Sequence, residues 1–127
     1  MHVKEEEHIM LHYSILLPLV KKVLERDLQL IEKGPFKLKD PYYLLINESL
    51  RSLHEDARKV KSFMHQRKMK AFFVENDGMF SRYTYTCRGY EGSISYLNAN
   101  LKRQARHSMD AYFKGKSPLE QESVLHS

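Results

Sequence analysis

The chain has 127 residues, the size of one ordinary domain, and it buries enough surface to fold without disulfides or metals. Its single cysteine, Cys87, excludes an intramolecular disulfide and the paired thiolates of structural zinc sites, which fits a reducing cytoplasm. The formal net charge is +5, and the acidic start of the chain and the short apolar run at 14–20 predict neither a signal peptide nor a membrane-spanning segment. We therefore expect a cytoplasmic protein with no membrane partner.

Apolar residues spaced three or four positions apart predict a long first helix over residues 5–33. Pro18 lies inside this stripe, and because it lacks a backbone donor we expect a kink or a break just before it. Gly34 and Pro35 are typical of a helix end.

A second helix is predicted from Asp40, which can cap the free first-turn amides, with Pro41 in the first helical position. Its apolar positions follow one another at intervals of four and three: Ile46, Leu50, Leu53, Ala57, Val60 and Met64. This spacing is typical of a coiled-coil seam and predicts antiparallel packing on the first helix.

Strand-forming residues then predict a β-hairpin at about 69–88, with a turn at Asn76-Asp77-Gly78. After Gly89 and Gly92, Ser93 is the predicted N-cap of a third helix. Residues 115–127 contain turn formers and few large apolar residues, so we expect a mobile tail. The predicted fold is one mainly helical α+β domain over residues 1–114, with the order α-α-β-β-α.

Two features of the sequence suggest chemical sites: a pair of histidines that could bind a metal ion and a cysteine that could act as a nucleophile. His8 and His12 lie four positions apart on a helix, as two metal ligands would, but a transition-metal site needs further ligands from elsewhere in the fold. Exposed histidines near a helix end are the commoner interpretation. Cys87 lies on the strand face of Tyr83 and Tyr85, which favours a buried thiol over a nucleophile.

The sequence contains no phosphate-binding loop, dinucleotide-binding motif or serine-nucleophile motif. We therefore predict no catalytic activity and no cofactor.

Positive charge gathers in the second half of the chain, where residues 51–106 contain twelve Lys or Arg and five Asp or Glu. A surface of this kind can bind nucleic acid or an acidic protein. The candidate residues come from the end of the second helix, the hairpin and the third helix: Lys68, Lys70, Arg82, Arg88, Lys102, Arg103 and Arg106. The alternative is a solvated outer face whose exposed ion pairs contribute roughly 0–1 kcal/mol each.

Both faces of the predicted hairpin carry large apolar groups, whereas three helices can cover one face. The uncovered face suggests an association surface made by Phe72, Phe80, Tyr83 and Tyr85. We therefore expect a small bacterial-type protein that works as a non-catalytic binding or regulatory homodimer. Nucleic-acid binding is the alternative function, and metal binding is a more distant one.

Overall fold

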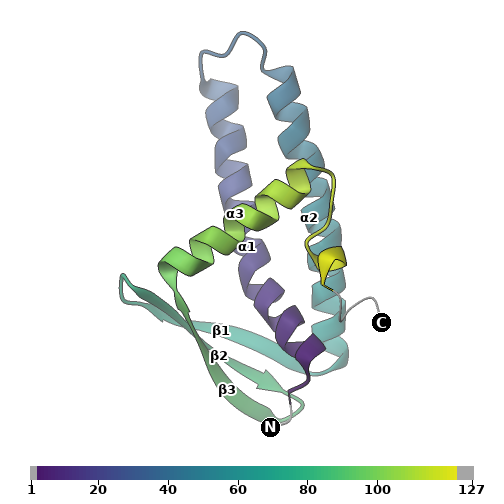
Figure 1. Cartoon of the computed structure of the whole chain (residues 1–127), viewed down its shortest axis with the longest axis vertical. Helices are drawn as coiled ribbons and strands as arrows, with labels where there is room; N and C mark the ends of the chain where they lie inside the picture. Colours follow the sequence, from purple (N-terminus) through teal and green to yellow (C-terminus); the bar gives the residue numbers. More distant parts are fainter. Residues whose placement is uncertain (1–2, 123–127) are drawn as a thin grey trace.

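The computed structural model describes residues 3–122 and is a mainly helical α+β fold. Two long helices are followed by a three-stranded antiparallel sheet and a third helix (Figure 1). The elements are α1 (Glu5–Lys33), α2 (Asp40–Gln66), β1 (Met69–Asn76), β2 (Phe80–Cys87), β3 (Tyr90–Leu97) and α3 (Asn98–Phe113). None of the helices in the described residues is long and apolar enough to cross a membrane.

The helices α1 and α2 form an antiparallel helical hairpin through the predicted seam. Leu17, Val20 and Leu24 of α1 are buried, as are Leu53 and Val60 of α2. Three acidic residues in the first turn of α1 favour its start, because the helix dipole is positive there. α1 runs through Pro18 without a break, and Asp40 is the first residue of α2 without a capping bond from its side chain.

The sheet has the strand order β1-β2-β3, so the predicted hairpin is present and a third strand extends it. β3 replaces the first part of the predicted third helix, and Ser93 lies within this strand, opposite Thr84. The prediction was wrong here because Ile94, Leu97 and Leu101 are also spaced three and four apart. Alternation of Ser93 and Ser95 with Ile94, the period of a strand, is the pattern that the structure follows.

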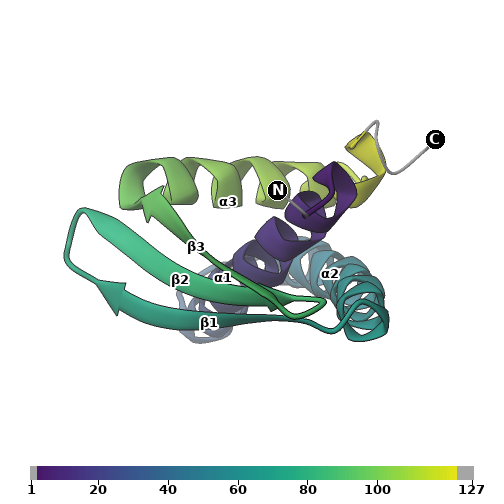
Figure 2. The same ribbon diagram turned by 90° about the horizontal axis from the view of Figure 1, so that it is seen from below.

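The helix α3 crosses the helical hairpin on the side that faces away from the sheet. Figure 2 shows the first turns of α1 between α3 and the sheet. The side chains of Leu101 and Tyr112 on α3 are buried in the common core.

Residues 116–122 fold back onto the helices, in contrast to the mobile tail predicted for 115–127. Leu119, in a single 3-10 turn, is buried, and the Ser117 hydroxyl donates a hydrogen bond of 2.6 Å to Asp56. The Tyr13 hydroxyl also donates to Glu122, at 2.9 Å. The rest of the predicted tail, residues 123–127, lies outside the described residues.

Candidate functional site

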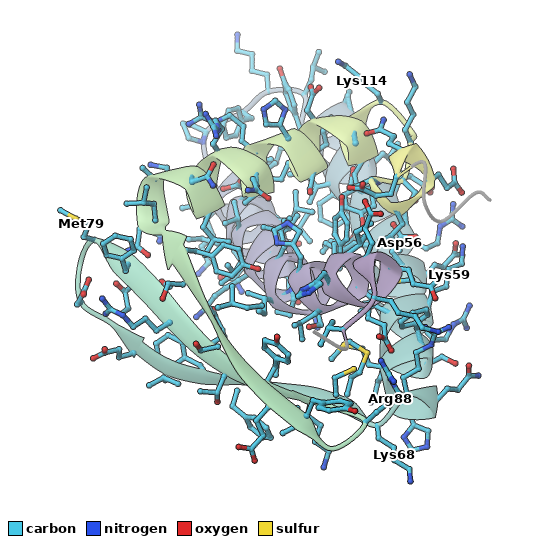
Figure 3. All side chains as sticks on the ribbon, turned by 60° about the horizontal axis from the view of Figure 1, so that its bottom comes forward. Asp56, Lys59, Lys68, Met79, Arg88 and Lys114 are labelled. Atoms are coloured by element: carbon cyan, nitrogen blue, oxygen red, sulfur yellow. The ribbon has the colours of Figure 1, made fainter. Side chains whose placement is uncertain are left out.

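The seven cations predicted to bind nucleic acid do not gather on one face. Lys68 and Lys70 lie where α2 passes into β1, and the amide of Arg88 in the β2–β3 turn donates to the Lys68 carbonyl. Arg82 lies six residues along β2, about 20 Å away at the rise of a strand. Figure 3 labels Lys68 and Arg88 at one end of the sheet and Met79 at the other. The remaining three cations are exposed on α3: Lys102, Arg103 and Arg106.

Two of these cations are held by carboxylates. Arg82 Nη1 lies 2.7 Å from Asp77 Oδ2 and 3.1 Å from Glu75 Oε1. Arg88 donates from Nε and Nη2 to the two carboxylate oxygens of Glu7, at 3.1 and 2.9 Å. Hydrogen bonds from Arg88 outweigh the effect of burial and lower the pKa of Glu7 to about 2. The charge of both arginines is therefore largely neutralised within the fold.

The aromatic residues predicted as one association surface lie on opposite faces of the sheet. Tyr85 faces the helices and is buried, and Tyr83 on the same face makes edge contacts with the rings of Phe73 and Tyr96. Phe72 and Phe80 are on the outer face. Alternation along β2 separates odd and even positions, so these four side chains cannot form one contact surface.

The candidate metal ligands His8 and His12 and the candidate thiol Cys87 lie in different environments. His12 is half buried, its Nδ1 lies 2.9 Å from the Tyr96 hydroxyl, and burial lowers its pKa. His8 is exposed beside the edge of the Tyr85 ring. Within residues 3–122, no three His, Cys, Asp or Glu side chains are grouped so that they could hold a metal ion. Cys87 is fully buried, as predicted, and burial raises the pKa of its thiol.

The largest accumulation of exposed apolar side chains is at the far end of the helical hairpin. Fifteen large hydrophobic residues are exposed in the described chain, and eight of them lie between residues 23 and 45. We call these eight the distal apolar surface: Val23, Leu30, Phe36, Leu38, Tyr42, Tyr43, Leu44 and Leu45. Figure 1 shows that this end of the hairpin extends beyond α3, with no other element over it.

The distal apolar surface continues a stripe that is buried closer to the sheet. Along α1, positions seven residues apart become steadily more exposed, from Leu16 at 2% to Val23 at 42% and Leu30 at 58%. Along α2, Ser49 is 1% exposed and Leu45, one turn earlier, is 41% exposed. The same faces of both helices therefore pass from covered to uncovered along the hairpin.

The loop between the helices adds to this surface. Leu38 is 74% exposed, and the rings of Phe36 and Tyr42 lie 6.0 Å apart. The Lys39 ammonium donates to the Glu32 carbonyl at 2.8 Å and ties the loop to the end of α1. Around the loop, the acidic Glu32 and Asp40 flank three lysines (Lys33, Lys37 and Lys39), so the apolar end carries only a small net positive charge.

The single apolar seam predicted along each helix does not account for the distal apolar surface. The signal was present as a second apolar stripe on α1, where Leu16, Val23 and Leu30 repeat every seven residues. A helix with two apolar faces needs two packing partners. The sequence does not show that α3 covers only part of the second face.

The comparisons with known proteins identify relatives of unassigned role. A family model described as YhjD protein matches residues 2–117. An uncharacterized protein YhjD of Bacillus subtilis (strain 168) is 32% identical over 111 residues, which cover 87% of this chain and 92% of the relative. No solved structure matches the chain.

Proposed function

The chain belongs to the YhjD protein family, and on that premise we propose that it is a non-catalytic binding protein of the cytoplasm that works as a homodimer. The distal apolar surface is the proposed interface. The observation that carries this proposal is the rise in exposure along α1, from Leu16 through Val23 to Leu30. Accumulations of exposed apolar side chains of this kind are uncommon on monomers and mark interaction sites.

A second copy of the chain is the partner that fits this surface best. The uncovered face of α1 presents Val23 and Leu30 at heptad spacing, which is the pattern of helix-on-helix packing, and the first turn of α2 adds the exposed residues Tyr42–Leu45. Two helical hairpins that meet through such faces form a four-helix arrangement with twofold symmetry, the commonest symmetry of soluble oligomers. The mixed charges around the loop let two identical surfaces approach without strong repulsion.

The proposal is tested by the mass of the protein in solution across a range of concentrations. Analytical ultracentrifugation of the wild type is expected to give twice the 15.1 kDa of one chain. The double variant Leu30→Glu/Leu45→Glu is expected to sediment as a monomer, because both side chains are exposed and the new charges would be buried in the interface. Circular dichroism checks that the variant keeps its helices.

Phe72→Ser is the matched control, since Phe72 is a comparably exposed residue on the outer face of the sheet. This variant is expected to remain a dimer. A wild type that is monomeric at every concentration, or a Leu30→Glu/Leu45→Glu protein that stays dimeric, would contradict the proposed interface. Dissociation by Phe72→Ser alone would place the interface on the sheet.

Nucleic-acid binding is the alternative function, and the exposed cations of α3 support it: Lys102, Arg103 and Arg106. The ion pairs of Arg82 and Arg88 weaken it, because these guanidinium groups already have carboxylate partners. Fluorescence anisotropy with short duplex and single-stranded DNA at about 50 and about 200 mM salt separates the two functions. Steeply salt-dependent binding that Arg103→Glu/Arg106→Glu abolishes would favour the alternative.

A further inference from the structure

A groove of about 620 Å³ lies between α1 and α2, at the end of the hairpin closer to the sheet. Its apolar floor comes from the helix seam and from the first residue of β1, with Leu17, Val60, Met64 and Met69 among its members. No residue of the distal apolar surface and no residue of α3 lines it. Its volume is in the range of about 300–1,000 Å³ typical of small-molecule sites.

The charges around this groove are of one sign. Arg58 and Lys61 line it from α2 and are both exposed, and His65 follows one turn later. The α1 side is uncharged and is formed by Tyr13, Ser14, Leu17 and Pro18. No Asp or Glu is among the described residues that line the groove. An apolar floor with cations along one edge is complementary to a molecule with an apolar body and an anionic end.

We propose that this groove binds a linear aliphatic carboxylate, with the hydrocarbon chain on the Leu17, Val60 and Met64 floor and the carboxylate beside Arg58 and Lys61. The two methionines of the floor, Met64 and Met69, favour a flexible chain over a rigid ring. Unbranched thioether side chains adapt to irregular apolar shapes. The site is separate from the proposed dimer interface.

The experiment is a titration with dodecanoate and, in parallel, with 1-dodecanol, read by displacement of 11-(dansylamino)undecanoate fluorescence. Dodecanoate is expected to bind about tenfold or more tightly than the alcohol, because only the carboxylate forms charge-assisted hydrogen bonds. Arg58→Glu/Lys61→Glu is expected to weaken dodecanoate by about tenfold or more and to leave the alcohol unchanged. Both replaced side chains are exposed, so the fold is kept.

Lys59→Glu is the matched control, because Lys59 is exposed on the same helix and does not line the groove. It is expected to bind dodecanoate like the wild type. Ala57→Leu, which fills the groove from its α2 side, is expected to weaken both ligands. Leu30→Glu/Leu45→Glu excludes binding at the distal apolar surface if it leaves the dodecanoate affinity unchanged.

Three outcomes would overturn the proposal. They are the absence of dodecanoate binding, equal affinities for the acid and the alcohol, and an affinity that Arg58→Glu/Lys61→Glu does not change. If dodecanoate does not bind, an acidic amphipathic peptide is tested in its place. Peptide binding that Arg58→Glu/Lys61→Glu abolishes would show that the occupant is a protein segment and would reject the carboxylate ligand.

Discussion

The carboxylate of Glu7, in the first turn of α1, accepts two hydrogen bonds from the guanidinium group of Arg88 in the β2–β3 turn, 81 residues later in the chain. Its Oε1 atom also accepts a bond of 2.9 Å from the backbone amide of Lys4. The Glu7 side chain is 1% exposed, whereas that of Arg88 is 38% exposed. A single buried carboxylate therefore joins the start of α1 to the β2–β3 turn, at the end of the sheet beside the α2–β1 junction.

Arg88→Ala is expected to lower the free energy of unfolding at pH 7, because the buried Glu7 carboxylate loses two hydrogen bonds. Removing one partner of a fully buried ion pair typically costs about 3–5 kcal/mol, but here only Glu7 is buried and Arg88 is 38% exposed and screened by solvent. A smaller loss is expected here because Arg67 Nη1 remains 3.7 Å from Glu7 Oε2. Urea denaturation of the two proteins measures the difference, and Arg51→Ala, at an exposed position of α2, is the control.

The cost of Arg88→Ala should depend on pH in a defined direction. The pKa of Glu7 is about 2 in the fold, below its ordinary value of 4.5, so the unfolded chain takes up the proton first as the pH falls. The stabilisation is complete above pH 4.5 and is lost between pH 4.5 and about 2. Wild type and variant should therefore converge in stability toward pH 2, and a constant difference down to that pH would contradict this assignment.

Lys68→Gly is expected to stabilise the fold by about 0.5–1 kcal/mol. Lys68 follows α2 with a φ of 52°, a left-handed conformation that glycine adopts without the steric cost of a Cβ atom. Arg88 has a similar φ of 49°, but Arg88→Gly should destabilise because it removes the bond to Glu7. Thermal unfolding distinguishes the two variants. A destabilised Lys68→Gly protein would show that the Lys68 side chain makes a contact that stabilises the fold by more than the left-handed conformation costs.

Gly92→Ala is expected to destabilise the fold by about 1–3 kcal/mol, the usual cost of overpacking. Gly92 is opposite Tyr85 in the sheet, and a Cβ atom at position 92 would overlap the Tyr85 ring. Tyr85→Leu should reduce the cost of Gly92→Ala, because the ring that causes the overlap is gone. A double-mutant cycle by urea denaturation measures this coupling, and strictly additive effects would exclude it.

Tyr112→Phe is expected to cost about 2 kcal/mol, in the range of hydrogen bonds to charged groups. The Tyr112 hydroxyl donates a bond of 2.7 Å to the buried Asp56 carboxylate, which also accepts from Ser117. Burial and Asp56 both raise the pKa of Tyr112, so the phenol stays protonated and keeps this bond across the neutral range. Phe113→Leu, at the exposed end of α3, should change the melting temperature little and is the control.

The sequence alone was enough to predict the elements whose signals are local. The first helix over 5–33, the second from Asp40 and the strands of the hairpin follow from apolar spacing and from breakers such as Gly34 and Gly78. Each of these signals acts within a few residues. β3 was missed because its apolar residues fit both a strand and a helix, and pairing with β2 decides between the two.

The exposure and the charge pairing of the surface residues depend on the tertiary structure. Nothing near Arg88 in the sequence indicates that its charge is paired with Glu7, since the two residues meet only when α1 packs against the sheet. The distal apolar surface likewise depends on where α3 crosses the helical hairpin, because Leu16 is covered and Leu30, two heptads later, is not. Local periodicity determined which residues form helices and strands, whereas exposure and charge pairing arise from contacts between distant segments, which the periodicity of a single chain does not encode.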